Sequence, residues 1–422
     1  MVQFGRNANQ GTVLLSSTFL RDELPVRLAH RVKELHELPY GLADMPSIIT
    51  VKNWYAKSFK DLTEFPAPRL PESIQRQLAM LSTSSDAEAR PNPSLQADAT
   101  IEDGVSKTHL DMTGQVVRRT PVLANRDYAR LGEINWPPEV EDYNVQFTRC
   151  LERIKWRHDG VVATIAQGIL EYNRARPNTT ERADLQQFLD RFYMSRIGIR
   201  FLIGQQIALG KSIMGKNDPL SRLIGAFEGD NSEEYVGIIC TNANVGKLAQ
   251  EAIENARFVC EEHYGLYKAP PVQLVCPSDL TFMYVPSHLN HMLFELLKNS
   301  LRAVVERYGS EAEDYPPIKV IVVEGNEDIT IKISDEGGGI PRSEVPKAWT
   351  YMYTTAQSEE LDPDLHTTDF QAPMAGFGYG LPLSRLYARY FGGDLKLISM
   401  ESYGTDVYLH LSRLSSSSEP LP

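Results

Sequence analysis

Cysteine is scarce in this 422-residue chain, which has only Cys150, Cys240, Cys260 and Cys276. No two of them form a CxxC pair, and only Cys260 has a histidine close by, His263. This spacing suits neither a zinc site nor a disulfide framework. The composition therefore excludes a disulfide-stapled mini-protein and favours a reducing compartment.

Long apolar runs are also missing, because no stretch of about 18 apolar residues occurs, and we expect no transmembrane helix. Basic residues are outnumbered, with 43 Lys and Arg against 55 Asp and Glu and a formal net charge of −12. This balance argues against a protein that binds nucleic acid through its phosphates. The first six residues lack the features of a secretory signal and have too few Arg and Ser for an intact organellar presequence.

The length predicts two or three domains, and the N-terminal half has mainly helical patterns. Apolar residues recur at three and four positions within 17–62, 145–173 and 180–209, which predicts a helical bundle. Between them, 82–138 is rich in Ser, Asp, Asn and Pro, and we expect a long loop or a disordered insertion there. The predicted bundle domain spans 1–229.

The C-terminal half has a mixed pattern that predicts an α/β sandwich over 230–412, followed by a loose tail at 413–422. A long helix is expected at 286–308, because Pro286 suits its first turn and Gly309 its end. Short strands are predicted at 235–240, 271–276, 318–323, 329–333, 395–400 and 405–411. The fold class is thus an α domain followed by an α/β domain.

The helix at 286–308 has two faces of different character. One face is polar and comprises His291, Glu295, Lys298, Asn299 and Arg302. The other is apolar and comprises Leu289, Leu293, Leu296 and Val304. The ordinary interpretation is a solvated amphipathic helix. The functional one is a nucleotide site, where Asn299 supplies an oxygen for Mg²⁺, Lys298 and Arg302 meet phosphate charge, and Glu295 accepts a proton from a nucleophile.

A carboxylate and three glycines follow the strand at 329–333. Asp335 lies on the same side as the isoleucines of that strand, because side chains alternate. Gly337, Gly338 and Gly339 then allow a sharp turn and a close approach to a ligand. Asp335 either completes a plain turn with local amides or accepts the exocyclic amine of an adenine, and the pattern leaves both interpretations open.

A second glycine cluster precedes a short helical pattern and consists of Gly376, Phe377, Gly378, Tyr379, Gly380 and Leu381. The backbone amides of such a loop can hold phosphate at a helix N-terminus. The spacing does not fit a dinucleotide-binding motif, and a Walker motif near 210–212 fails because Gln205 replaces its first glycine. Thr405 begins the last strand and is either a second adenine contact or an ordinary strand residue.

Four short sequence motifs, called boxes below, occur in an order that resembles the ATP site of the gyrase, Hsp90, histidine-kinase and MutL superfamily. They are Glu295 with Asn299, Asp335-x-Gly337-x-Gly339, Gly376-x-Gly378-x-Gly380 and Gly404-Thr405. The longer runs 188–196, 284–289 and 375–394 are similar to the mitochondrial pyruvate dehydrogenase kinases. This resemblance covers nearly the whole chain from Phe19, with the insertion before Glu139 as the main departure.

The resemblance implies a serine protein kinase that transfers the γ-phosphoryl group of ATP to the E1α subunit of pyruvate dehydrogenase and inactivates it in the mitochondrial matrix. It implies Mg²⁺ and, as a further candidate, K⁺. Glu295 would be the general base with His291 tuning it, and Asn299 would hold Mg²⁺. Asp335 and Thr405 would read adenine. Thr354, Thr355 and the loop at 376–381 would close over phosphate.

The resemblance also implies partners: the lipoyl domain of the E2 core, and a second copy of the chain in a homodimer. His158 and Arg196 resemble the family's pocket for pyruvate-like inhibitors, although Asp159-Gly160 departs from the usual Asn-Asp. A phospho-histidine relay is not expected, because the run 195–206 has no histidine. The motifs of ordinary protein kinases are missing, and Asp369-Phe370-Gln371 only imitates one of them.

Two alternatives remain at this point. The kinase of branched-chain 2-oxo acid dehydrogenase is a close relative with the same ATP boxes, and the segment 235–240 leans towards it. The runs 188–196 and 375–394 lean more strongly towards the pyruvate enzyme. The second alternative is an ATP-gated regulatory binding module. An intact Glu295 and Asn299 argue against such a module.

Overall fold

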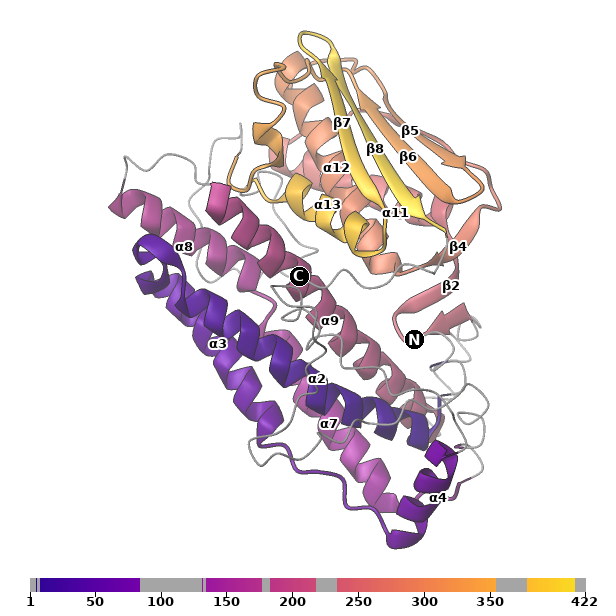
Figure 1. The fold of residues 1–422 in the computed structure, drawn as a ribbon. Coiled ribbons are helices and arrows are strands. Elements are labelled where there is room, and N and C mark those ends of the chain that lie inside the picture. Colours follow the sequence, from indigo (N-terminus) through magenta and orange to yellow (C-terminus); the bar gives the residue numbers. More distant parts are fainter. Residues whose placement is uncertain are drawn as a thin grey trace, which may run out of the picture.

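The computed structural model describes residues 8–83, 134–176, 183–217, 234–353 and 378–413, together with Gly5 and Leu131. Nearly all of the predicted insertion and tail lies outside these residues, as does the predicted boundary between the two domains. Figure 1 shows a bundle of long helices and, next to it, a sheet with helices packed on it. The expected class, a helical domain followed by an α/β domain, is confirmed.

Within the described residues, the bundle is built from long helices with shared apolar interior positions. They are α2 (Gln10–His36), α3 (Pro46–Thr63), α7 (Pro138–Arg157), α8 (Val161–Ala175) and α9 (Ala183–Asn217). A 3₁₀ helix η1 (Pro39–Asp44) and helix α4 (Glu72–Thr83) accompany them. Leu24, Leu28, Tyr55, Phe147 and Phe192 are fully buried between the helices. Among the described helices, none is apolar enough over a sufficient length to cross a membrane.

The helix bounds differ from the sequence prediction in several places: the stretch predicted at 17–62 is α2, η1 and α3, and the one predicted at 180–209 is α9, which continues to Asn217. Helix α2 begins at Gln10 and not near Ser17, because Asn9 accepts a bond from the Thr12 amide and the Thr12 hydroxyl accepts one from Asn9, forming a capping box. The single helical stretch predicted at 145–173 is two helices, since the chain turns between Arg157 and Val161. Such caps and breaks depend on local bonds that apolar periodicity does not reveal.

The C-terminal domain contains a five-stranded sheet in the order β3-β5-β6-β8-β7. Its strands are β3 (Val272–Val275), β5 (Ile318–Glu324), β6 (Asp328–Asp335), β7 (Asp394–Met400) and β8 (Gly404–Ser412). All neighbours are antiparallel except the parallel pair β3 and β5. Helices α11 (Val245–Tyr264), α12 (Pro286–Tyr308) and α13 (Gly380–Tyr390) cover one face (Figure 1). The helix predicted at 286–308 is therefore confirmed at both ends.

A small sheet lies between the two parts and consists of β1 (Tyr235–Val236), β2 (Ile239–Asn244) and β4 (Thr281–Tyr284). The strand predicted at 235–240 is thus wrong as one element, because Gly237 takes a positive φ of 67° and turns the chain into a hairpin. Helix α11 and strand β4 were not predicted from the sequence. The Gln205 side chain of α9 bonds both the Val236 carbonyl and the Ile238 amide at 2.9 Å, which joins this hairpin to the bundle.

Helix α9 also contacts the α/β domain at the loop that contains Tyr351. The Tyr351 hydroxyl donates to Asp190 Oδ1 at 2.7 Å, and its amide donates to Gln186 Oε1 at 2.9 Å. The Tyr193 ring packs against the rings of Tyr351 and Tyr379, with centroids 5.5 and 5.8 Å apart. The bundle therefore supports the backbone that leads into helix α13.

Candidate active site

Helix α12 carries its polar residues into the interior of the protein. His291, Glu295 and Lys298 are only 6%, 5% and 2% exposed. The apolar face is buried as well, because α12 packs against α11, α13 and the sheet. The solvated amphipathic helix is therefore ruled out as an interpretation. A buried carboxylate and ammonium group need a structural or chemical reason to be there.

Glu295 and Lys298 form a buried ion pair, with Lys298 Nζ 2.8 Å from Glu295 Oε1. The other oxygen, Oε2, faces Gly380, where any Cβ atom would collide with it. Gly380 is the first residue of α13, so the Glu295 carboxylate lies at a helix N-terminus, where the helix dipole favours negative charge. Lys298 thus has a charge partner already, and Arg302 has one in Glu306 at 3.5 Å.

Replacing Lys298 with methionine is expected to lower the free energy of unfolding by about 3–5 kcal/mol, because it leaves Glu295 buried without its partner. Chemical unfolding of the purified variant measures this change. The double variant Glu295→Gln/Lys298→Met should recover most of the loss. Lys211→Met removes an exposed pair with Glu152 and serves as the matched control, with an expected change under about 1 kcal/mol. An equal loss of unfolding free energy in Lys298→Met and Lys211→Met would contradict the assignment of Lys298 as the buried partner of Glu295.

His291 and Asn299 lie one turn before and after Glu295 on the same helix. The His291 ring packs edge-on against Tyr387 of α13, with ring centroids 5.1 Å apart. The Asn299 side chain is half-buried, and the part of the chain that the structure describes offers it no hydrogen-bond partner. Its amide oxygen is therefore available to a ligand at this face of the helix.

Asp335 ends strand β6 on its buried side, as the alternation predicts. Its Oδ1 accepts the Gly337 amide at 2.9 Å and the Thr405 amide at 3.3 Å, and its Oδ2 accepts the Ser300 hydroxyl at 2.9 Å. Burial raises the pKa of Asp335, and the three donors oppose that effect. The Gly337 bond matches the plain-turn interpretation, but the bonds to Ser300 and Thr405 tie the carboxylate to two other elements.

Thr405 lies directly opposite Asp335 in the register of β6 and β8. Its hydroxyl is 2.9 Å from the Ser399 hydroxyl on β7. The two chain segments approach very closely there, since a Cβ atom at Gly404 would collide with the Asp335 carbonyl oxygen. The predicted pair of adenine-reading groups therefore shares one corner of the sheet, next to helix α12.

The second glycine cluster is only partly within the described residues. Thr354, Thr355, Gly376 and Phe377 lie outside them, so their predicted phosphate contacts have no structural test. Gly378 has a φ of 74° and leaves no room for a side chain beside the Tyr353 backbone.

The side chains that follow Gly378 turn away from the site. The Tyr379 ring is buried against Tyr193 and Tyr351, and Leu381 packs on the core. Within the described part of the predicted loop, only the backbone faces Glu295. The phosphate contacts assigned to Tyr379, Gly380 and Leu381 therefore remain predictions about backbone groups.

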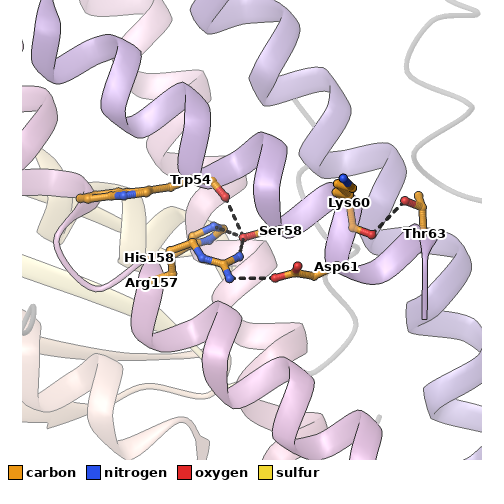
Figure 2. Close-up of polar contacts among 7 residues, drawn as sticks. All are labelled: Trp54, Ser58, Lys60, Asp61, Thr63, Arg157 and His158. Atoms are coloured by element: carbon orange, nitrogen blue, oxygen red, sulfur yellow. Dashed lines mark hydrogen bonds and ion pairs between the residues drawn. The ribbon is translucent and has the colours of Figure 1, made fainter. Parts of the chain in front are cut away.

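His158 and Arg196 meet inside the bundle, although they are 38 positions apart, with Arg196 Nη2 3.2 Å from the His158 carbonyl oxygen. The Ser58 hydroxyl donates to the Trp54 carbonyl at 2.8 Å and lies 3.0 Å from His158 Nε2 (Figure 2). Because the single hydroxyl hydrogen goes to the carbonyl, the imidazole donates from Nε2. Arg157 of α7 donates from Nη1 to the Ser58 hydroxyl and from Nη2 to the Asp61 carboxylate, each at 2.7 Å, and both acceptors lie on α3 (Figure 2).

Burial, together with the guanidinium groups of Arg196, Arg200 and Arg157, lowers the pKa of His158 to about 3. The unfolded chain therefore binds one more proton than the folded chain between pH 3 and about 6.5. Neutral His158 therefore makes its full contribution to the free energy of unfolding above pH 6.5. This contribution is lost as the pH falls, by about 2 kcal/mol between pH 7 and pH 5. Chemical unfolding at both pH values measures it. His158→Gln should lose this dependence, whereas the exposed control His263→Gln should keep it; equal dependence in all three would contradict the assignment.

Comparison with known proteins gives one consistent result. A family model described as mitochondrial branched-chain alpha-ketoacid dehydrogenase kinase matches residues 1–240, and one for histidine kinase-, DNA gyrase B- and HSP90-like ATPases matches 284–415. The mitochondrial pyruvate dehydrogenase (acetyl-transferring) kinase of Schizosaccharomyces pombe is 45% identical over all of this chain and 93% of its own length. The chain belongs to the mitochondrial pyruvate dehydrogenase kinase family. The resemblance inferred from the sequence is therefore confirmed.

Other members of the family agree. The Arabidopsis thaliana mitochondrial pyruvate dehydrogenase kinase is 40% identical over the whole chain and 91% of its own length, and human isozyme 3 is 37% identical over the whole chain and 83% of its own. The segment that the ATPase family model matches, 284–415, contains α12, both glycine clusters and Thr405. The four boxes therefore lie within one matched domain.

The site residues fit the ligands expected of this family's ATPase domain. The described residues include no cluster of three or more His, Cys, Asp or Glu side chains that could hold a metal alone. Mg²⁺ in nucleotide sites is typically held by one or two protein oxygens together with the phosphates, and the available Asn299 amide matches that need. The glycines and the Asp335 acceptor suit the close approach of a nucleotide.

Sequence reasoning missed one member of the site, Ser300. It lies on the apolar stripe of α12, in line with Leu293, Leu296 and Val304, and is buried. A lone hydroxyl on such a stripe needs a partner, and this was the available signal. The partner, Asp335, lies 35 positions away, so only the fold could identify it.

Proposed function

We propose that this chain is a serine protein kinase that transfers the γ-phosphoryl group of ATP to the E1α subunit of the pyruvate dehydrogenase complex and thereby inactivates it. The observation that carries the proposal is the buried Glu295 carboxylate, held by Lys298 and placed at the N-terminus of α13. Asp335 of β6, which bonds Ser300 of α12, and Thr405 of β8 lie beside a later turn of α12 and face the other end of an extended nucleotide. The names of the relatives point to the same reaction and substrate.

Each residue has a distinct role in this reaction. Glu295 accepts the proton of the serine hydroxyl while the hydroxyl oxygen attacks the γ-phosphorus and ADP leaves. Lys298 holds the carboxylate in place through Oε1, and His291 tunes it from the preceding turn. Asn299 would hold Mg²⁺, which neutralises phosphate charge when bound. Asp335 accepts the adenine amine, and Thr405 provides the second adenine contact.

The remaining phosphate contacts follow the sequence motifs. We assign them to Arg302, Thr354, Thr355 and the loop at 376–381, including Gly376, Phe377, Gly378, Tyr379, Gly380 and Leu381. Lys298 contributes charge to the same region, although its nearest partner is Glu295. K⁺ remains a candidate cation without an assigned ligand in this chain.

The partners are inferred from the family and from the surface. We infer that the chain works in the mitochondrial matrix, bound to the lipoyl domain of the E2 core, and that His158 and Arg196 take part in binding pyruvate-like inhibitors. A homodimer is supported by the open face of the sheet, where Val275, Val323, Ile398 and Met400 are each more than half exposed. The pair on β3 and β5 and the pair on β7 lie at opposite edges of the sheet, with Lys332 and Asp406 between them, and a second surface that covers either pair removes apolar area from water.

The kinase of branched-chain 2-oxo acid dehydrogenase is the second candidate, because the model that matches residues 1–240 bears that description. The test is incubation of the chain with Mg-ATP and, separately, purified pyruvate or branched-chain E1, each with its E2 core. Phosphate on the α subunit and the remaining dehydrogenase activity are followed. Selective labelling of pyruvate E1 is expected. Selective labelling of branched-chain E1 would favour the second candidate, and tight ATP binding without labelling would favour a regulatory module.

A further inference from the structure

Arg307, in the last turn of α12, makes three hydrogen bonds to backbone carbonyl groups. Its Nη1 donates to the Glu336 carbonyl at 2.8 Å and to the Tyr403 carbonyl at 2.5 Å. Its Nη2 donates to the Ser402 carbonyl at 3.0 Å. These acceptors belong to two different loops, so one side chain crosslinks both of them to the helix.

The two loops are the immediate neighbours of the proposed adenine-reading groups. Glu336 follows Asp335 directly, and Ser402 and Tyr403 precede Thr405 by three and two positions. The loops also bond to each other, since the Gly338 amide donates to the same Tyr403 carbonyl at 3.1 Å. Arg307 therefore contacts backbone on both sides of this corner of the site, while remaining exposed itself.

The turn before Thr405 is not a relaxed structure. Ser402 has a φ of 67°, which is unfavourable for a residue with a Cβ atom. The opposing loop packs so closely that a Cβ atom at Gly339 would collide with the Met400 carbonyl. A strained turn persists only where surrounding bonds hold it, and the Arg307 bond to the Ser402 carbonyl is one of them.

From these contacts we propose that Arg307 is a positioning residue for nucleotide binding: by holding the loop after Asp335 and the turn before Thr405 together, it presets both adenine-reading groups. The proposal rests on the proposed function of the site as an ATP site. Arginine suits this role because its planar fork offers several donors in a rigid arrangement, which a lysine ammonium cannot reproduce.

The role has a specific consequence for base selectivity. Adenine presents an amine where guanine presents a carbonyl oxygen, and a carboxylate accepts a hydrogen bond only from the amine. Discrimination between ATP and GTP therefore depends on the exact placement of Asp335. Loss of the crosslink should weaken adenine nucleotide binding and reduce this discrimination, while Glu295 at the other end of the site keeps its environment.

The test uses the full chain and the variants Arg307→Met and Arg307→Lys. Titration calorimetry with Mg-ADP gives the affinity, and assays with pyruvate E1 and its E2 core give kcat and kcat/KM for ATP and GTP. Arg307→Met is expected to weaken Mg-ADP binding and to reduce the ATP:GTP preference, each about tenfold, with kcat at saturating ATP within about twofold of the parent. Arg307→Lys should have an affinity and an ATP:GTP preference between those of the parent and those of Arg307→Met. Arg257→Met, which removes a pair with Glu261 on α11, is the matched control.

Unchanged affinity and unchanged ATP:GTP preference in Arg307→Met would overturn the proposal while leaving the proposed function intact. A fall in kcat without a change in affinity would also overturn it. If Arg307→Met does not fold, Arg307→Lys decides by the same comparison. If the unsubstituted chain neither binds Mg-ADP nor labels an E1, the proposed function fails, and the role of Arg307 fails with it.

Discussion

Replacing Glu295 with glutamine is expected to lower kcat for E1α phosphorylation by about 10²- to 10⁴-fold while Mg-ATP binding persists. The amide cannot accept the serine proton, but it has nearly the shape of the carboxylate and leaves the Asp335 corner untouched. Phosphate incorporation at saturating ATP measures kcat, and titration calorimetry without E1 measures binding. The two readings together separate a general base from a residue that only binds nucleotide.

Glu254→Gln is the matched control on the neighbouring helix α11, because Glu254 is exposed and bonds Gln250 and, among the described residues, no residue assigned to the site. It should leave kcat unchanged. Since Glu295→Gln also leaves Lys298 buried without its anion, the double variant Glu295→Gln/Lys298→Met tests whether any loss comes from instability. Full activity in Glu295→Gln would exclude this residue as the base, and loss of ATP binding in a folded protein would make its role one of binding.

Replacing Asp335 with alanine is expected to weaken Mg-ATP binding by about 10²-fold, because a bond to an ionised acceptor is among the stronger hydrogen bonds in a buried site. The substitution removes the proposed acceptor of the adenine amine. It also leaves the Ser300 hydroxyl and the amides of Gly337 and Thr405 without their shared partner. Titration calorimetry with Mg-ATP measures the affinity, and a thermal melt shows that the variant is folded.

Two further variants locate the cause of that loss. Asp328→Ala, at the partly exposed start of the same strand, should bind Mg-ATP as the parent does. Ser300→Ala removes one donor to the carboxylate but keeps the acceptor, so its affinity should fall much less. If Asp335→Ala binds Mg-ATP as tightly as the parent, the adenine assignment is wrong and Asp335 only completes a turn.

Local signals in the chain were enough for several elements of the site. The proline and glycine that bound α12 set both of its ends, because their backbone preferences act within one or two residues. Alternation along β6 placed Asp335 on the buried side, because the strand geometry allows no other arrangement. The boxes around Glu295, Asp335 and Thr405 indicated the ATPase superfamily, and the longer runs 188–196, 284–289 and 375–394 indicated the kinase family, which the comparisons confirm.

The sequence by itself thus determined the fold class, the family, the bounds of α12 and the positions of the boxes, since these depend on short-range geometry and on motifs. Only the tertiary structure decided that the polar face of α12 is buried, that Ser300 bonds Asp335, and that Arg307 joins two loops. These contacts join residues about 30 to 100 positions apart. Backbone propensity carries no information about such pairs, which form only when the whole domain packs.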